Sequence, residues 1–167
     1  MLRSAEIFHL AERASEFGLS AENISFDLSK IIARSRKISG QLNQGVGHLL
    51  KKNKVTVFSG EAKLVDSSTV SFTMEGKNTH LTAKNIILAT GARARELPGM
   101  EADGNLVWTY KHALSPSKMP KKLLVIGSGA IGVEFASFYN TFGAKTTVVE
   151  VLDLSLIHIS EPTRLGF

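Results

Sequence analysis

The sequence predicts an α/β fold, because segments of helical periodicity occur together with short segments of strand character. Three observations lead to this prediction. Residues 121–151 show the pattern of a strand, a glycine-rich turn, a helix and a second strand. Apolar residues recur at helical intervals between residues 2 and 53, and several short segments after residue 54 alternate apolar and polar positions.

Composition narrows the functional classes. The chain has 167 residues, enough for one domain or parts of two, and no cysteine, which excludes a disulfide framework or a thiolate metal site. No apolar run approaches the roughly 18 residues of a membrane span, and the scattered charges of residues 1–20 do not fit a secretory signal. The net charge of +5 comes largely from residues 30–54, where no aromatic residue is interleaved to stack on bases. We interpret these cations as a solvated helix face and not as a nucleic-acid surface.

The N-terminal part predicts two helices. Apolar residues from Leu2 to Phe17 share one face, and Gly18 is a typical stop. A second helix is expected from Asp27, a good N-cap, to about Asn53.

Short strands are expected next. Residues 55–60, 62–66 and 69–74 alternate, and residues 80–83 continue the pattern, which indicates a β-meander inserted in an α/β domain. Residues 85–90, "NIILAT", form an unbroken apolar run, typical of a strand buried on both faces. Ligands in open α/β sheets lie near the ends of such strands, but an ordinary strand-to-loop turn explains Thr90 and Gly91 equally well. Residues 91–122 are irregular, and 114–120 form the predicted linker.

The turn after residue 126 carries the strongest signal. Gly127, Gly129 and Gly132 match G-x-G-x-x-G between a strand and a helix from Ala130 to Phe142, and a second strand then leads to Glu150. The glycines permit a tight turn, the approach of a pyrophosphate, and close helix–strand packing. The carboxylate of Glu150 can accept both ribose hydroxyls and would repel a 2′-phosphate, so the pattern predicts NAD and not NADP. The alternative is a glycine-rich turn of another α/β protein.

Two longer segments resemble a known family. "IILATGARARELPG" and "HALSPSKMPKKLLVIGSGAIGVEFASFYNTFGAKTTVVEVLD" are similar to the bacterial dihydrolipoyl dehydrogenases, which are flavoprotein pyridine nucleotide-disulfide reductases, and the similarity is collinear from Leu2 to about Asp153. The resemblance implies that residues 1–113 are part of an FAD-binding Rossmann-like domain with an inserted β-meander. Residues 121–153 would then begin an NAD-binding Rossmann domain.

The family's activity follows as an expectation. The resemblance implies an enzyme that oxidises protein-bound dihydrolipoamide and passes electrons through FAD to NAD. It also implies a homodimer, lipoyl domains of 2-oxo acid dehydrogenase complexes as partners, and a cytoplasmic location. No membrane or nucleic-acid partner and no metal is expected.

The resemblance also assigns site residues. Those that match the family's FAD contacts are Ala62, Thr90, Gly91 and Ala92. Those that match the NAD contacts are Gly127, Ser128, Gly129, Ala130, Ile131, Gly132, Val133, Glu134 and Glu150. Glu134 also matches a glutamate that lies near the flavin and pairs with a lysine not found in this chain; from the residues alone it is a helix-surface acid.

Several family features do not occur in the sequence. The first glycine-rich turn, the C-x-x-x-x-C pair and the C-terminal His-Glu base are missing, so we expect no catalytic residue in this chain and no activity from the chain alone. His9, His48, His80 and His112 show no metal or triad spacing and are expected to be structural or on the surface. We therefore expect an internal fragment of the enzyme.

The end of the chain departs from the family. Residues Leu154 to Arg164 can be encoded without a gap by a transposase mosaic-end adapter, so residues 154–167 are expected to be a non-native tail and His158 to have no role. Two alternatives to the assigned function remain. One is another flavoprotein disulfide reductase, of the glutathione or mercuric reductase type, and the other is a redox-inactive nucleotide-binding module.

Overall fold

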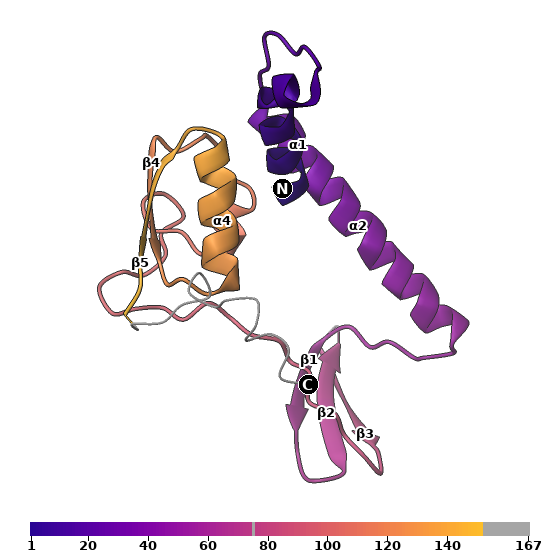
Figure 1. Cartoon of the computed structure of the whole chain (residues 1–167). Coiled ribbons are helices and arrows are strands. Elements are labelled where there is room, and N and C mark those ends of the chain that lie inside the picture. Colours follow the sequence, from indigo (N-terminus) through magenta and orange to yellow (C-terminus); the bar gives the residue numbers. More distant parts are fainter. Residues whose placement is uncertain (75, 152–167) are drawn as a thin grey trace, which may run out of the picture. The chain divides into compact units, whose positions relative to one another are not determined.

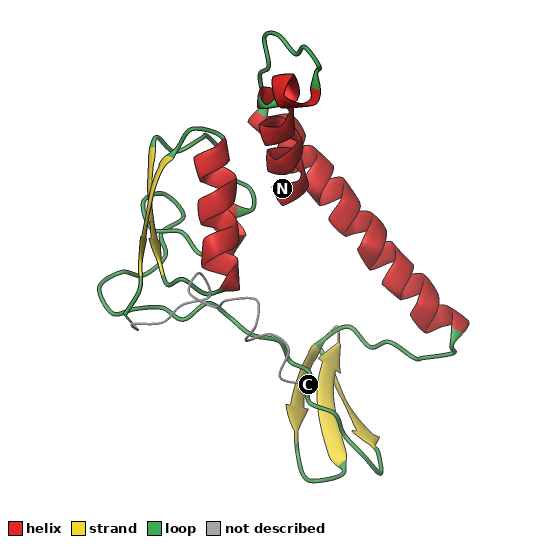
Figure 2. Cartoon of the chain, in the orientation of Figure 1, coloured by secondary structure: helices red, strands yellow, loops and turns green. Residues whose placement is uncertain are grey.

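The computed structural model describes residues 1–74 and 76–151. Its elements, in order, are α1 (Leu2–Glu12), the 3₁₀ helix η1 (Ala14–Phe17), α2 (Leu28–Lys52), β1 (Glu61–Leu64), β2 (Thr69–Met74), β3 (Lys77–Thr82), α3 (Tyr110–Ala113), β4 (Lys122–Ile126), α4 (Ala130–Thr141) and β5 (Lys145–Val149) (Figure 1; Figure 2). The mixed helix and strand architecture confirms the predicted fold class. The predicted tail, residues 154–167, lies outside the described residues.

The chain divides into two compact units. One comprises residues 1–38 and the chain from Ala94 onward, and the other comprises residues 39–93, so α2 runs from the first unit into the second. This division does not follow the predicted boundaries at residues 113, 120 and 153. The domain assignment therefore stays a prediction.

The two N-terminal helices form where the sequence predicts them, with one difference. Asp27 caps α2, since its Oδ1 accepts the backbone N–H of Lys30 at 3.1 Å. The first predicted helix ends early, at Glu12, and the chain tightens into η1. Gly18 closes η1 with a φ of 73°, a left-handed conformation that favours glycine.

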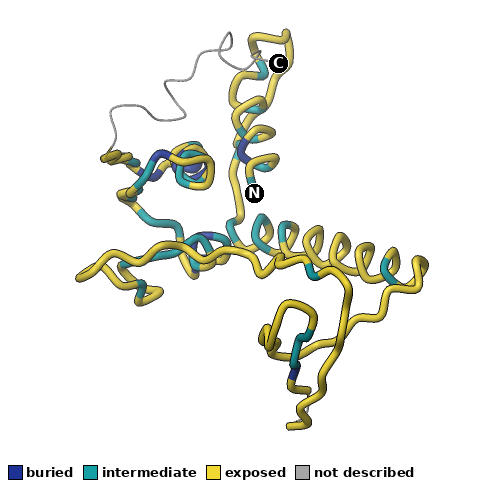
Figure 3. Tube along the Cα trace, turned by 90° about the horizontal axis from the view of Figure 1, so that it is seen from below, coloured by how far each residue is buried: buried dark blue, intermediate teal, exposed yellow. Residues whose placement is uncertain are grey.

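The β-meander forms the second unit's only sheet among the described residues. Strands β1, β2 and β3 pair antiparallel in that order, with Ala62 opposite Phe72 and Phe72 opposite Thr79. Phe72 is buried and contacts the ring of Phe58, with the two ring centroids 4.8 Å apart. Most other residues of this unit are exposed, as the burial colouring shows (Figure 3).

Two predicted strands are wrong. Residues 55–60 and 85–90 have no strand structure, and Ile87 and Leu88 are 91% and 71% exposed. A strand needs a neighbour for its N–H and C=O groups, and the described part of the chain pairs none with these segments. The apolar run of residues 85–90 indicates that these side chains favour burial, but it does not provide the neighbouring strands that a sheet requires.

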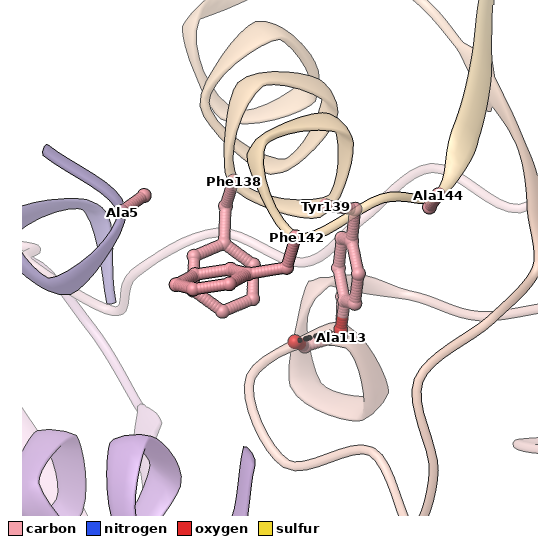
Figure 4. Close-up of a cluster of buried hydrophobic side chains, with 6 residues drawn as sticks. All are labelled: Ala5, Ala113, Phe138, Tyr139, Phe142 and Ala144. Atoms are coloured by element: carbon pink, nitrogen blue, oxygen red, sulfur yellow. Dashed lines mark hydrogen bonds between the residues drawn. The ribbon is translucent and has the colours of Figure 1, made fainter. Parts of the chain in front are cut away.

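The core of the first unit is a cluster between α1, α3, α4 and β5. Its buried members are Ala5, Ala113, Phe138, Tyr139, Phe142 and Ala144 (Figure 4). Phe142 contacts Phe8 and Phe26, with ring centroids 5.1 and 4.6 Å apart. This cluster holds α4 in place, and α4 in turn carries the glycine-rich turn at its N-terminus.

Candidate dinucleotide-binding site

The glycine-rich turn and Glu150 lie at the same end of a parallel strand pair. Strands β4 and β5 pair in parallel, with Ile126 opposite Val149, and the N–H of Gly127 continues the ladder by donating to the carbonyl of Val149 at 2.8 Å. Both strands therefore deliver their following residues to one edge of the sheet. Ligands of open α/β sheets bind at this carboxyl edge.

Two of the three glycines are required by the fold itself. Gly127 has a φ of 98°, a conformation that other residues rarely adopt. At Gly132 a Cβ atom would overlap the carbonyl oxygen of Gly127 and would lie 3.2 Å from Cγ1 of Val125. The turn and the first turn of α4 consequently pack closer than any side chain at position 132 allows.

Gly129 differs from the other two. It is the N-cap of α4, its φ of −65° and ψ of 169° are open to any residue, and a Cβ built on it meets nothing within 4 Å. The space beside this residue is open. The first N–H groups of a helix have no intrahelical partner, so the open side of Gly129 also presents donors and the positive end of the helix dipole. Such an arrangement fits a phosphate group.

Glu150 is held against the turn by Ser128. One carboxylate oxygen, Oε2, accepts the backbone N–H of Ser128 at 2.7 Å and its hydroxyl at 2.6 Å. The other oxygen, Oε1, accepts the N–H of Val151 at 2.7 Å. Both bonds to Ser128 are charge-assisted and short, so they fix the carboxylate beside the turn.

The remaining residues of the predicted NAD set lie along the first turns of α4. Ala130, Ile131 and Glu134 are exposed, and Ile131 keeps 59% of its surface accessible. Gly132 and Val133 are half-buried, and the N–H of Val133 donates to the carbonyl of Gly129. The structure thus brings the glycines, Ser128 and Glu150 together and leaves Glu134 on the helix surface.

The residues predicted to contact FAD all belong to the other unit. Ala62 is exposed on β1, and Thr90, Gly91 and Ala92 are exposed in an irregular segment in which Gly91 has a φ of 78°. The buried polar residue among the described residues, Ser128, belongs to the first unit. The described residues of the second unit therefore offer no buried polar side chain to a flavin. The described geometry therefore does not by itself form a flavin site.

Sequence reasoning found the position of Ser128 but not its role. The two residues are 22 positions apart, and sequence spacing alone does not show that a turn serine contacts a carboxylate just after the next strand. A serine in a glycine-rich turn followed by an acid at the end of the second strand is the signal that could have indicated the pair.

Of the other candidate residues, His112 has a structural role. The backbone N–H of Thr109 donates to Nδ1 of His112 at 3.1 Å, so this histidine caps α3, as expected of a structural residue. In the described ranges no three acidic or histidine side chains gather as a metal site would require. No helix within those ranges has the length and apolar character needed to span a membrane.

Comparison with known proteins agrees with this geometry. The family model described as pyridine nucleotide-disulphide oxidoreductase matches residues 2–163. A relative named dihydrolipoyl dehydrogenase, from Zymomonas mobilis, is 55% identical over 151 residues, which are 90% of this chain and 32% of the relative. The chain thus spans about a third of the length of that protein.

Solved structures show the same fold. The crystal structure of LpdA from Mycobacterium tuberculosis superposes with a TM-score of 0.82 at 27% identity, covering 92% of this chain and 34% of that one. The flavoprotein disulfide reductase RclA from Escherichia coli, described as HOCl-induced, gives a TM-score of 0.70 at 25% identity, covering 94% and 33%. On this evidence the chain belongs to the pyridine nucleotide-disulphide oxidoreductase family.

Proposed function

We propose that residues 121–151 bind the adenosine half of NAD, within a dihydrolipoyl dehydrogenase that oxidises protein-bound dihydrolipoamide. The observation that carries the proposal is the Ser128–Glu150 pair beside the open helix N-terminus at Gly129. The similarity to relatives named dihydrolipoyl dehydrogenase supports the substrate, and the family model supports the nucleotide.

The chemistry of each group in the site fits this ligand. The N–H groups at the start of α4 would receive the pyrophosphate, and the open space at Gly129 would admit it. The Glu150 carboxylate would accept the hydroxyls of the adenosine ribose. The same charge would oppose a 2′-phosphate, so we propose NAD and not NADP. When bound, NAD supplies the acceptor for a hydride, and this part of the chain holds and orients it.

FAD enters the proposal through the family resemblance. Ala62 and the segment Thr90–Ala92 are proposed to approach the flavin nucleotide, and the described geometry of that unit neither encloses nor orients it. The cysteine pair of the family does not occur in this sequence, so no step of dithiol oxidation is assigned to residues of this chain. The homodimer, the lipoyl-domain partners and the cytoplasmic location belong to the same proposal.

A second candidate is a flavoprotein disulfide reductase with another substrate. The similarity to RclA favours this second candidate, because RclA has the same fold and is described as a different flavoprotein disulfide reductase. The two candidates share the NAD site and differ in substrate. In a polypeptide of the relatives' length that carries this sequence, we expect NAD to be reduced by dihydrolipoamide, and we expect no turnover of glutathione disulfide or mercuric ion. The reverse result would favour the second candidate.

The nucleotide site is tested by measuring the binding of NADH to the full 167-residue chain through the change in NADH fluorescence. Gly129→Val should abolish binding, because its side chain would occupy the open space beside the turn, where a Cβ meets nothing of the fold within 4 Å. Gly40→Val is a matched control: Gly40 is an exposed residue of α2, and a Cβ added there also meets nothing within 4 Å. Equal binding by Gly129→Val, or no binding by the unmodified chain, would contradict the proposal.

A further inference from the structure

Ser128 has an unusual environment for a serine in a turn. Ser128 is only 2% exposed, although its neighbours Gly127 and Gly129 are more accessible. Its hydroxyl donates to Oε2 of Glu150 at 2.6 Å, and its backbone N–H donates to the same oxygen at 2.7 Å. One residue of the turn therefore holds one oxygen of the carboxylate from two directions.

We propose that Ser128 is a positioning residue that sets the choice between NAD and NADP by fixing the Glu150 carboxylate. The proposal rests on the NAD site described under Proposed function and deepens it. Ser128 acts through Glu150 and makes no contact with the ribose in this role.

The need for such a residue follows from where Glu150 lies. Strand β5 ends at Val149, so Glu150 follows the last residue paired in the ladder. A glutamate side chain has several rotatable bonds, and ordering it has an entropic cost that a fixed partner offsets. A serine hydroxyl on a buried turn is a short, rigid partner, and a bond to a charged acceptor is stronger than a neutral one.

Discrimination between NAD and NADP depends on the position of the Glu150 carboxylate. Repulsion between the carboxylate and a 2′-phosphate rises as their separation falls, and so does the strength of a bond to a ribose hydroxyl. Without the hydroxyl of Ser128 the carboxylate loses one of its hydrogen bonds and can turn away from a 2′-phosphate more easily. NADPH binding then improves while NADH binding weakens, and the ratio of the two affinities reports the change.

The experiment measures the dissociation constants of NADH and NADPH with the full chain and with Ser128→Ala. We expect the preference for NADH to fall by about 3- to 10-fold in the variant. Partial unfolding scales both apparent constants by the same folded fraction, so it cancels in their ratio. Ser137→Ala is the matched control, because Ser137 is an exposed serine of α4, the helix that follows the turn, and it should leave the ratio unchanged.

A double-mutant cycle separates positioning from a merely structural role. In a Glu150→Ala background, Ser128→Ala should no longer alter the ratio, because the residue through which it acts is gone. Ser128→Thr, which keeps a hydroxyl, should retain part of the preference. An unchanged ratio in Ser128→Ala, or an equal change with and without Glu150, would overturn the inference. If the unmodified chain binds neither nucleotide, the proposed function fails instead, and the two failures are thereby distinct.

Discussion

The hydroxyl of Tyr139 donates a hydrogen bond of 2.7 Å to the backbone carbonyl of Ala113, inside the core of the first unit (Figure 4). Ala113 is the last residue of α3, and the final carbonyls of a helix have no partner within it. Tyr139 lies on α4 and is fully buried. The bond therefore satisfies the end of α3 from the last turn of α4, and it links the irregular segment before β4 to the helix that carries the glycine-rich turn.

Tyr139→Phe should destabilise the chain by about 1–3 kcal/mol, because it leaves a buried carbonyl without its partner. The ring remains, so the contacts with Phe138 and Trp108 are kept. Unfolding in urea gives the free energy. Tyr110→Phe is the matched control: the other tyrosine of the chain is half-buried, and no hydrogen bond of its hydroxyl occurs within the described ranges. Equal stability of the two variants would contradict the assignment.

The same tyrosine should make stability depend on alkaline pH. Burial raises the pKa of Tyr139 to about 12, above its ordinary value of 10.0. The folded state thus keeps its proton where the unfolded state loses it, so this contribution is complete below pH 10 and is lost as the pH rises toward 12. At about 1.4 kcal/mol per pKa unit, the loss amounts to roughly 2–3 kcal/mol.

The measurement compares the unmodified chain with Tyr139→Phe at each pH, because titration of the other groups is common to both. The stability advantage of the tyrosine should shrink between pH 10 and 12. An advantage that stays constant over this range would show that the hydroxyl is accessible to solvent.

The sequence predicts the elements that depend on local signals. Helix α2 has its N-cap at Asp27 and a long apolar periodicity, and the glycine spacing from Gly127 to Gly132 lies between a strand and a helix, as predicted. The strand predicted at residues 85–90 failed because strands are completed by neighbours, which a run of apolar residues does not specify. The Ser128–Glu150 pair was missed for a similar reason, since it forms only when β4 and β5 are already in register.

Gly132→Ala should destabilise the βαβ unit by about 1–3 kcal/mol, the usual cost of adding an atom to a well-packed site. Its Cβ would overlap the carbonyl oxygen of Gly127, so either α4 moves away from β4 or the turn opens. Gly129→Ser is the control, because a Cβ added there meets nothing within 4 Å and serine is a favourable N-cap. Thermal melts of both variants provide the comparison. If Gly129→Ser is the less stable of the two, the close packing at Gly132 is not the constraint that the geometry indicates.

Asp103 organises the loop before α3. Its Oδ1 accepts the backbone N–H groups of Asn105, Leu106 and Val107 at 2.8, 2.9 and 2.8 Å. The N–H groups of Asp103 and Gly104 both donate to the carbonyl of Val107 at 3.1 Å, which closes the loop. One carboxylate thus gathers three donors that would otherwise face water.

These bonds lower the pKa of Asp103, with the N–H of Val107 contributing most. A lowered pKa in the folded state means that the loop is held at neutral pH and loosens as the pH falls through the folded-state pKa. Asp103→Ala should have the same effect at every pH. The one tryptophan of the chain, Trp108, reports it, because its Nε1 donates to the carbonyl of Asn105 at 2.9 Å. We expect a red-shifted emission from Asp103→Ala at pH 7 and from the unmodified chain only in acid.

Asp66→Ala provides the control, since Asp66 accepts the N–H of Ser68 in a similar turn within the other unit. Its removal should leave the tryptophan emission unchanged while exchange of the Ser68 amide with solvent becomes faster. Hydrogen exchange at residues 105–107 should be faster in Asp103→Ala alone. Emission and exchange that do not respond to Asp103→Ala would show that Trp108 and its neighbours hold the loop without the carboxylate.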